Sequence, residues 1–106
     1  MKPKALQFLQ KIKTTILEVS PDAQVFVFGS QARGTAHKDS DWDILILLPK
    51  DQIQPEEESN LTDPLYDLEL ASGQVISPFI YSVSDWNSRY TITPLYHQIK
   101  LEGKRL

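Results

Sequence analysis

Two short apolar runs, Gln24–Phe28 and Trp42–Leu48, constrain the fold of this chain more than any other feature. Both are rich in β-branched, aromatic and leucine residues, and Gly29 and Pro49 end them. Runs of this length and composition are typical of buried strands. Because the chain has only 106 residues, we expect one domain over residues 1–106, built around a single core of two layers.

Helical patterns flank these two strands. Apolar residues recur three or four positions apart over residues 4–19, which predicts an amphipathic helix. A second helix is expected over residues 64–72, because Asp63 is a suitable N-cap and a proline follows it at the first helical position. Ser84 is expected to cap a short helix, and residues 94–102 form the last predicted helix.

A third strand is predicted over residues 75–81. It contains Pro78, which cannot donate a hydrogen bond to a neighbouring strand, so we expect it at a sheet edge or with a bulge. Residues 50–60 are polar and are expected to form a mobile connection. Together these elements predict an α/β (α+β) fold in which about four helices flank a small three-stranded sheet.

The composition excludes several classes of site. The chain has no cysteine, so it has no disulfide, no thiolate zinc site and no cysteine nucleophile. No apolar run approaches the roughly 20 residues that span a bilayer, and residues 1–4 are not followed by the apolar block of a signal peptide. We therefore expect a cytoplasmic protein with no membrane partner.

Charge is unevenly distributed along the chain. Residues 51–88 contain eight acidic residues and no lysine or arginine, whereas the flanking segments have a small excess of basic residues. Without a clustered basic surface, direct binding of nucleic acid is not expected. The acidic stretch is most simply a solvated helix face, with a docking surface for a basic partner as the alternative.

The residues with the clearest chemical meaning are a Gly29–Ser30 pair, followed after ten residues by Asp41 and Asp43. Glycine lets the backbone approach a phosphate closely, and serine offers a hydroxyl and a backbone N–H to it. The two aspartates are two positions apart at the start of a strand, so their side chains project from one face, and Trp42 between them is expected in the core. Paired carboxylates that meet substrate phosphates are typical of a Mg²⁺ site.

A calcium-binding loop is the competing interpretation of the acidic residues. Asp39, Asp41 and Asp43 match the first, third and fifth positions of such a loop. The sixth position, however, is Ile44 instead of the glycine that the turn needs, and the twelfth is Lys50 instead of glutamate. We therefore reject a calcium loop.

The Gly-Ser-x₁₀-Asp-x-Asp pattern resembles that of the minimal nucleotidyltransferases in the DNA polymerase beta superfamily. The resemblance extends over nearly the whole chain, from the first predicted helix to the ending over residues 94–103. It implies the mixed-sheet nucleotidyltransferase fold, which binds an NTP with Mg²⁺ (or Mn²⁺) and transfers a nucleotidyl group to an acceptor hydroxyl. Small members of this family are commonly encoded beside a HEPN-domain protein, as antitoxins that bind or adenylylate that partner.

Carried over to this chain, the family pattern implies a role for each residue of the motif. Gly29 and Ser30 would contact the β- and γ-phosphates of the nucleotide, and Asp41 and Asp43 would hold the metal ions and form the catalytic pair. Arg33 would add a phosphate contact, since its guanidinium suits phosphate geometry, with an ordinary surface arginine as the alternative.

The chain departs from the family at one position. The family usually has a third carboxylate on its third strand, and here that position falls on Ser77, which carries no charge. A metal ion that activates the acceptor would lose a ligand, unless Asp67, Glu69 or Asp85 replaces it in space. Nucleotide binding is therefore better supported than catalysis.

Two functions remain open from the sequence. The first is an Mg²⁺-dependent nucleotidyltransferase that uses an NTP, with ATP expected, on a small or macromolecular hydroxyl acceptor. The second is an antitoxin-like subunit that keeps the nucleotide pocket but acts by binding a partner, for which the acidic residues 51–70 and the edge strand would be the surfaces. In either case we expect a partner subunit or self-association to complete the cleft of a chain this small. The acceptor, the base preference and the partner are not specified by the sequence.

Overall fold

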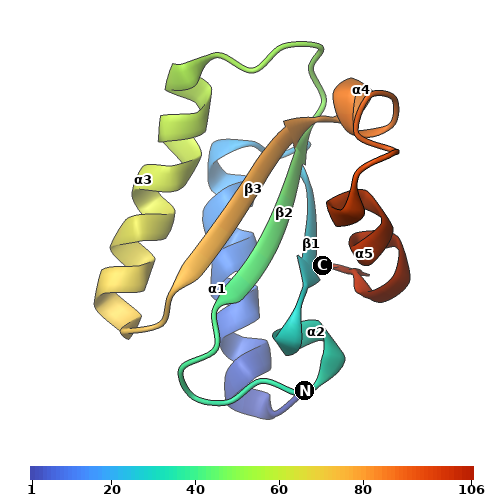
Figure 1. Cartoon of the computed structure of the whole chain (residues 1–106). Coiled ribbons are helices and arrows are strands. Elements are labelled where there is room, and N and C mark those ends of the chain that lie inside the picture. The colour runs from blue at the N-terminus through green and yellow to red at the C-terminus, as the bar shows by residue number, and fades with distance from the viewer.

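The computed structural model describes all residues, 1–106, as a mixed sheet with helices on both faces (Figure 1). The strands lie in the order β3-β2-β1-β4. β1 pairs antiparallel with both β2 and β4, whereas β2 and β3 are parallel. The strands are β1 (Gln24–Phe28), β2 (Trp42–Leu48), β3 (Ile76–Ser82) and β4 (Lys104–Arg105). The α/β class is confirmed.

The sheet has four strands instead of the predicted three, because a two-residue strand lies near the C-terminus. Lys104 and Arg105 of β4 pair with Val27 and Phe26 of β1. The Leu106 N–H continues this pairing by donating to the Val25 carbonyl at 2.9 Å. Two exposed basic residues have no intrinsic preference for a strand, so only this contact with β1 makes them one.

There are five helices, one more than the predicted number, because the turn after β1 forms a helix of its own. They are α1 (Pro3–Val19), α2 (Ser30–Arg33), α3 (Pro55–Ser72), α4 (Val83–Trp86) and α5 (Pro94–Glu102). α1 and α5 lie close to their predicted positions. α4 is capped by Ser82 instead of Ser84, because the Ser82 hydroxyl accepts from the Asp85 N–H at 3.0 Å.

α3 begins nine residues before its predicted start and includes much of the segment expected to be mobile. Its first turn contains Pro55, and Glu57 reaches back to accept from the Gln54 N–H at 3.3 Å. Pro64, predicted to open the helix, lies inside it and removes one backbone hydrogen bond. The helix continues through Pro64 because Leu61 and other apolar residues of the same face pack into the core.

β3 lies at the edge of the sheet, where Pro78 was expected. Its register with β2 runs without interruption from the Trp42–Ile76 pair to the Leu48–Ser82 pair, so there is no bulge. The parallel register therefore aligns Ser77 with Asp43. Ser77 is the residue at which the sequence placed the family's missing third carboxylate.

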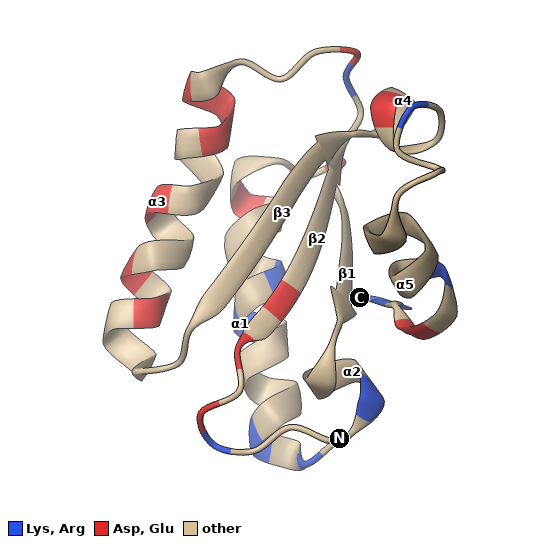
Figure 2. Ribbon diagram, in the orientation of Figure 1, with Lys and Arg blue, Asp and Glu red and all other residues tan.

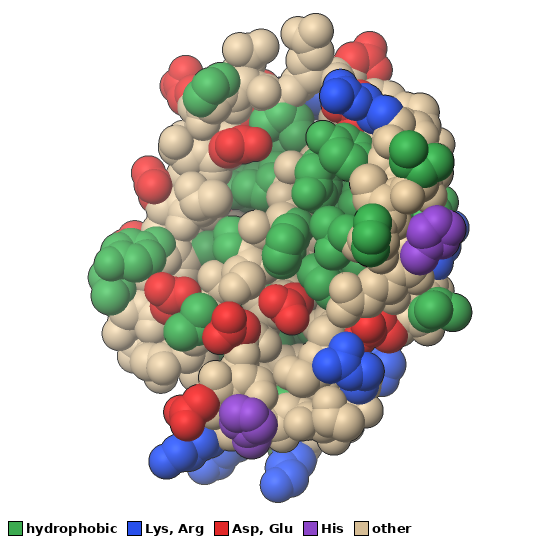
Figure 3. All heavy atoms as spheres, viewed as in Figure 1, with side chains coloured by type: hydrophobic (Ala, Val, Ile, Leu, Met, Phe, Trp, Pro, Cys, Tyr) green, Lys and Arg blue, Asp and Glu red, His purple; other side chains and the backbone are tan.

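The two faces of the sheet are covered differently. On one face, α1 and α3 enclose the larger core, which includes the alternate β2 residues Trp42, Ile44, Ile46 and Leu48. On the other, the short helices α4 and α5 pack through Trp86 and Ile99 on a smaller core. Trp86 stacks on Tyr81 with 5.4 Å between ring centroids. Figure 3 shows hydrophobic side chains gathered over this second face, with acidic side chains beside them.

No helix is both long enough and apolar enough to cross a membrane.

Candidate functional site

The two aspartates lie where β2 begins, at the end of the sheet that α4 and α5 leave open. Asp41 is exposed just before the strand, and Asp43 is half-buried as its second residue. Figure 2 shows this acidic segment at the start of β2, away from the acidic residue of α4 at the opposite end of the strand. Asp43 shares its sheet face with the buried side chains Leu45 and Leu47.

Trp42 points to the opposite face, as predicted, and is 1% exposed. Its ring lies 5.4 Å from that of Phe8 in α1, and its Nε1–H donates to Gln74 Oε1 at 2.8 Å. This side chain fixes the start of β2 in the core. Because side chains alternate along a strand, it also directs Asp43 outward.

Gly29 and Asp43 converge at this open end. Gly29 has φ +75° and ψ −158°, a backbone conformation that residues with a Cβ rarely adopt. A Cβ at this position would overlap Asp43 Oδ2 and would lie 3.2 Å from its Cγ. The turn after β1 therefore requires glycine twice, once for its dihedral angles and once for the approach of the carboxylate.

The helix α2 starts directly at this turn and contains two of the predicted site residues. Ser30 is its first residue and is half-buried. Arg33 is its last and is followed by Gly34, whose φ of +76° ends the helix. The predicted set of Gly29, Ser30, Arg33 and Asp43 thus lies around one turn of the backbone, with Asp41 just outside it.

Glu102, at the end of α5, joins this set and was missed by the sequence analysis. Its Oε2 accepts from the Gly29 N–H at 3.0 Å and from Arg33 Nη1 at 2.8 Å. Arg33 is therefore not a free surface arginine, and Glu102 already binds the guanidinium nitrogen Nη1 that could otherwise contact a phosphate. An acidic residue in the last turn of a helix is unfavourable with the helix dipole, and this was the one signal in the sequence that Glu102 has a specific partner.

The electrostatics of the site centre on Asp43. Burial raises the pKa of the Asp43 carboxyl above its ordinary value, and the Asp41 charge raises this pKa further. Arg33 acts in the opposite direction, and Glu102 adds a smaller increase. Neither Asp41 nor Asp43 is in a salt bridge. Neither carboxylate therefore has a direct ion-pair partner, although Arg33 is close enough to act on Asp43.

No third acidic residue completes the pair. Ser77 lies opposite Asp43 in the register, and no group of three or more acidic or histidine side chains is close enough to hold a metal ion. Glu69 instead accepts from the Ile76 N–H at 2.8 Å, Asp67 is exposed on α3, and Asp85 lies on α4 near Arg89. None of these three replaces the missing carboxylate.

The remaining donor set still fits one hard cation. Mg²⁺ is usually bound through one or two carboxylates, with phosphate oxygens and water as its other ligands. Asp41 and Asp43 provide these two carboxylates. Burial is the main cause of the raised Asp43 pKa, and repulsion from Asp41 adds to it; a bound cation would relieve that repulsion. A second ion with ligands of its own from the protein does not fit.

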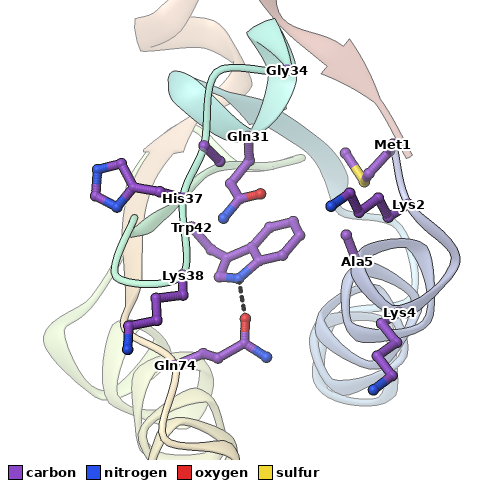
Figure 4. A pocket seen from close by; sticks show the side chains of 11 residues that line it. Met1, Lys2, Lys4, Ala5, Gln31, Gly34, His37, Lys38, Trp42 and Gln74 are labelled. Atoms are coloured by element: carbon purple, nitrogen blue, oxygen red, sulfur yellow. Dashed lines mark hydrogen bonds between the residues drawn. The ribbon is translucent and has the colours of Figure 1, made fainter.

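A cavity of about 810 Å³ lies beside the site but does not contain it. Figure 4 shows it between the start of α1 and the loop after α2, with Trp42 and its hydrogen bond to Gln74 in the wall. Lys2, Lys4 and Lys38 also line the cavity. The two aspartates and Gly29 do not line it. Because Asp43 projects from the opposite face of the sheet, the acidic site is separate from this cavity.

The family of nucleotidyltransferase domains matches residues 9–82 of the chain, which include the Gly-Ser turn and both aspartates. No curated protein matches the chain.

Several solved structures are similar in fold. One is a toxin–antitoxin complex with AMP-PNP, with a TM-score of 0.65 and 24% identity over 91% of this chain and 69% of the other. A mutant of the MntA–HpeT toxin–antitoxin has the same TM-score and identity over 92% and 70%. A tri-AMPylated HEPN toxin with its MNT antitoxin, from Shewanella oneidensis, has a TM-score of 0.62 and 19% identity over 95% and 70%.

Proposed function

Because the chain belongs to the nucleotidyltransferase domain family, we propose that it transfers a nucleotidyl group, AMP from ATP, to an acceptor hydroxyl with Mg²⁺ or Mn²⁺. The observation that carries this proposal is the convergence of Gly29 and Asp43. It joins a turn suited to phosphate to a carboxylate suited to a cation, at an end of the sheet that the helices leave open.

The proposed roles follow from the chemistry of each group. The backbone of Gly29 and Ser30 would bind the β- and γ-phosphates, together with the Ser30 hydroxyl, and Arg33 would contact a phosphate oxygen. Asp41 and Asp43 would hold the cation. When bound, the cation would neutralise phosphate charge and polarise the phosphorus that the acceptor attacks. The chain itself would orient the α-phosphate for in-line attack by the acceptor oxygen. The bond between the α-phosphorus and the oxygen that bridges to the β-phosphate would break, with inversion at phosphorus, and pyrophosphate would leave.

Ser77 sets a limit on the rate. A serine hydroxyl is a poor base and carries no charge, so it would neither accept the proton of the attacking hydroxyl nor hold a second ion. We therefore expect slow transfer, in which charge neutralisation and positioning provide most of the rate enhancement.

The proposed acceptor is a hydroxyl on a HEPN-type protein. The support is that similar folds occur in toxin–antitoxin complexes, one of which contains an AMPylated HEPN toxin. A second candidate function is favoured by Ser77: an antitoxin-like subunit that binds nucleotide and partner without transferring anything.

One experiment separates these two candidates. The protein is incubated with labelled ATP, Mg²⁺ or Mn²⁺ and a HEPN-domain protein as the proposed partner, and label on the partner is measured. We expect Asp41→Asn and Asp43→Asn to reduce transfer about a hundredfold or more, because each removes a cation ligand. Asp39→Asn, in the same exposed loop, is the matched control and should retain transfer.

Ser77→Asp sharpens the test. It places a carboxylate opposite Asp43 in the parallel register, and we expect transfer to rise about tenfold or more. Suppose that the wild-type protein and both aspartate variants inhibit the activity of the partner while no label is transferred. The chain then acts as a binding subunit and not as an enzyme.

A further inference from the structure

The Glu102 carboxylate occupies the position at the Gly-Ser turn where an anion would bind. One oxygen, Oε2, receives both the Gly29 N–H at 3.0 Å and Arg33 Nη1 at 2.8 Å. The Glu102 side chain is only 17% exposed, whereas that of Arg33 is 48% exposed. The contact is therefore a defined, partly desolvated one, and its acceptor comes from 73 residues along the chain.

The fold holds Glu102 in this place from both sides. On one side, α5 packs on the sheet through the buried Ile99. On the other, Gly103 leads directly into β4, which pairs with β1 just before the turn. Gly103 lies so close to α5 that a Cβ would meet the Ile99 carbonyl oxygen at 2.6 Å. The end of α5 and the turn after β1 therefore form one packed unit.

A carboxylate and a phosphate present the same chemistry to these donors. Both offer charged oxygens, and both form their strongest hydrogen bonds with backbone N–H groups and arginine. The donors that bind Glu102 are two of those that the proposed function assigns to the nucleotide. A phosphate oxygen and Glu102 Oε2 cannot occupy one site together, and their negative charges repel each other.

We propose that Glu102 is a built-in competitor of the nucleotide, which keeps the phosphate-binding turn closed until a phosphate displaces it. This inference rests on the proposed function for the identity of the ligand. Displacement frees Arg33 and the Gly29 N–H together, since one oxygen holds both. The cost of this displacement lowers the affinity of the resting protein for the nucleotide.

The test compares the wild-type protein with Glu102→Gln and Glu102→Ala. Glutamine keeps the shape but removes the charge, and alanine removes the acceptor altogether. Glu58→Gln, which removes an acid from the exposed face of α3, is the matched control. Two probes are titrated by calorimetry: inorganic pyrophosphate alone, and ATP with Mg²⁺. The chemical shift of the Gly29 amide is followed by NMR.

We expect pyrophosphate and ATP to bind about tenfold more tightly to both Glu102 variants. A gain of this size corresponds to removing about one charge-assisted hydrogen bond that the phosphate would otherwise have to displace. The Gly29 amide should shift in the free Glu102 variants and shift again when pyrophosphate binds. Equal or weaker binding of both probes to the two variants overturns the inference, because Glu102 would then support the turn instead of blocking it.

Failure of the proposed function would look different. In that case, no label reaches a partner from ATP in any variant, while the pyrophosphate titration still reports on Glu102. Conversely, the wild-type protein could transfer AMP while its Glu102 variants gain no affinity for pyrophosphate. The proposed function would then stand, and the role of Glu102 as a competitor would be contradicted.

Discussion

The two faces of the sheet use the same strands but differ in how completely helices cover them. α1 and α3, both long, enclose one face and bury every second residue of β2. α4 and α5 are short and cover only part of the other face, so Asp43 remains half-buried at its open end. The difference indicates that one face provides most of the stability, which allows the other to keep unneutralised carboxylates near the surface.

The largest expected effect comes from neighbouring residues on the two faces. Ile46 is 0% exposed in the larger core and Leu47 is 3% exposed in the smaller one. We expect Ile46→Ala to lower the free energy of unfolding by about 4 kcal/mol and Leu47→Ala by about 2–3 kcal/mol, because the cavity left under two long helices collapses less. Urea denaturation measures both. Equal losses in the free energy of unfolding would contradict the conclusion that the face covered by α1 and α3 provides most of the stability.

A smaller loss is expected from Gly29→Ala. The substitution strains the backbone and pushes a Cβ into Asp43, so we expect a loss of about 2–3 kcal/mol in the free energy of unfolding. Gly73→Ala is the control. Gly73 has a similar φ of +73° but open space around it, so only backbone strain of about 1 kcal/mol applies.

The double variant Gly29→Ala with Asp43→Ala extends this comparison. It should recover part of the Gly29→Ala loss, because the overlapping carboxylate is gone. Strictly additive losses in thermal or urea unfolding would mean that Gly29 and Asp43 do not meet at the open end.

The smallest effect is the pH dependence of stability that Asp43 contributes. Its pKa is raised in the folded protein, mainly by burial, so folding opposes its ionisation. Stability is therefore lost as pH rises from below the ordinary carboxyl range, and the loss is complete above the folded pKa. We expect Asp43→Asn to raise the melting temperature slightly at pH 7 without divalent cations, and to have no such effect near pH 3.

Mg²⁺ provides the internal check on this prediction. Bound between the carboxylates, it should reduce the difference between Asp43→Asn and the wild type at pH 7, because it stabilises only the protein that keeps both ligands. Asp39→Asn is the control for the change in net charge. A melting temperature that falls in Asp43→Asn would contradict a site whose carboxylates have no direct ion-pair partner.

The sequence predicted β1 and β2 to the residue, because buried strands are specified by their own apolar runs. The family resemblance placed the missing third carboxylate at Ser77, and the register of β3 with β2, which the sequence did not predict, sets that residue opposite Asp43. The sequence misplaced the start of α3, since Pro55 and Pro64 carry equally good local signals for a helix start. Only packing of the residues around Pro64 decides between them.

The candidate site was predicted only in part, for a related reason. Gly29, Ser30, Arg33, Asp41 and Asp43 are within fifteen residues of one another, so spacing alone can relate them. The partner of Arg33 and Gly29 lies on the last helix and reaches them because β4 pairs with β1. No local pattern encodes a strand of two charged residues, so this part of the site needed the structure.

The fluorescence of the two tryptophans of the chain can report separately on the two faces of the sheet. Trp42 is buried against α1, and Trp86, the last residue of α4, is buried in the smaller core on the other side of the sheet. Each indole lies in one core only, so replacing either by phenylalanine leaves a fluorophore that reports on the other layer. Stopped-flow emission from the two single-tryptophan proteins would then reveal whether the layers come apart together or in sequence.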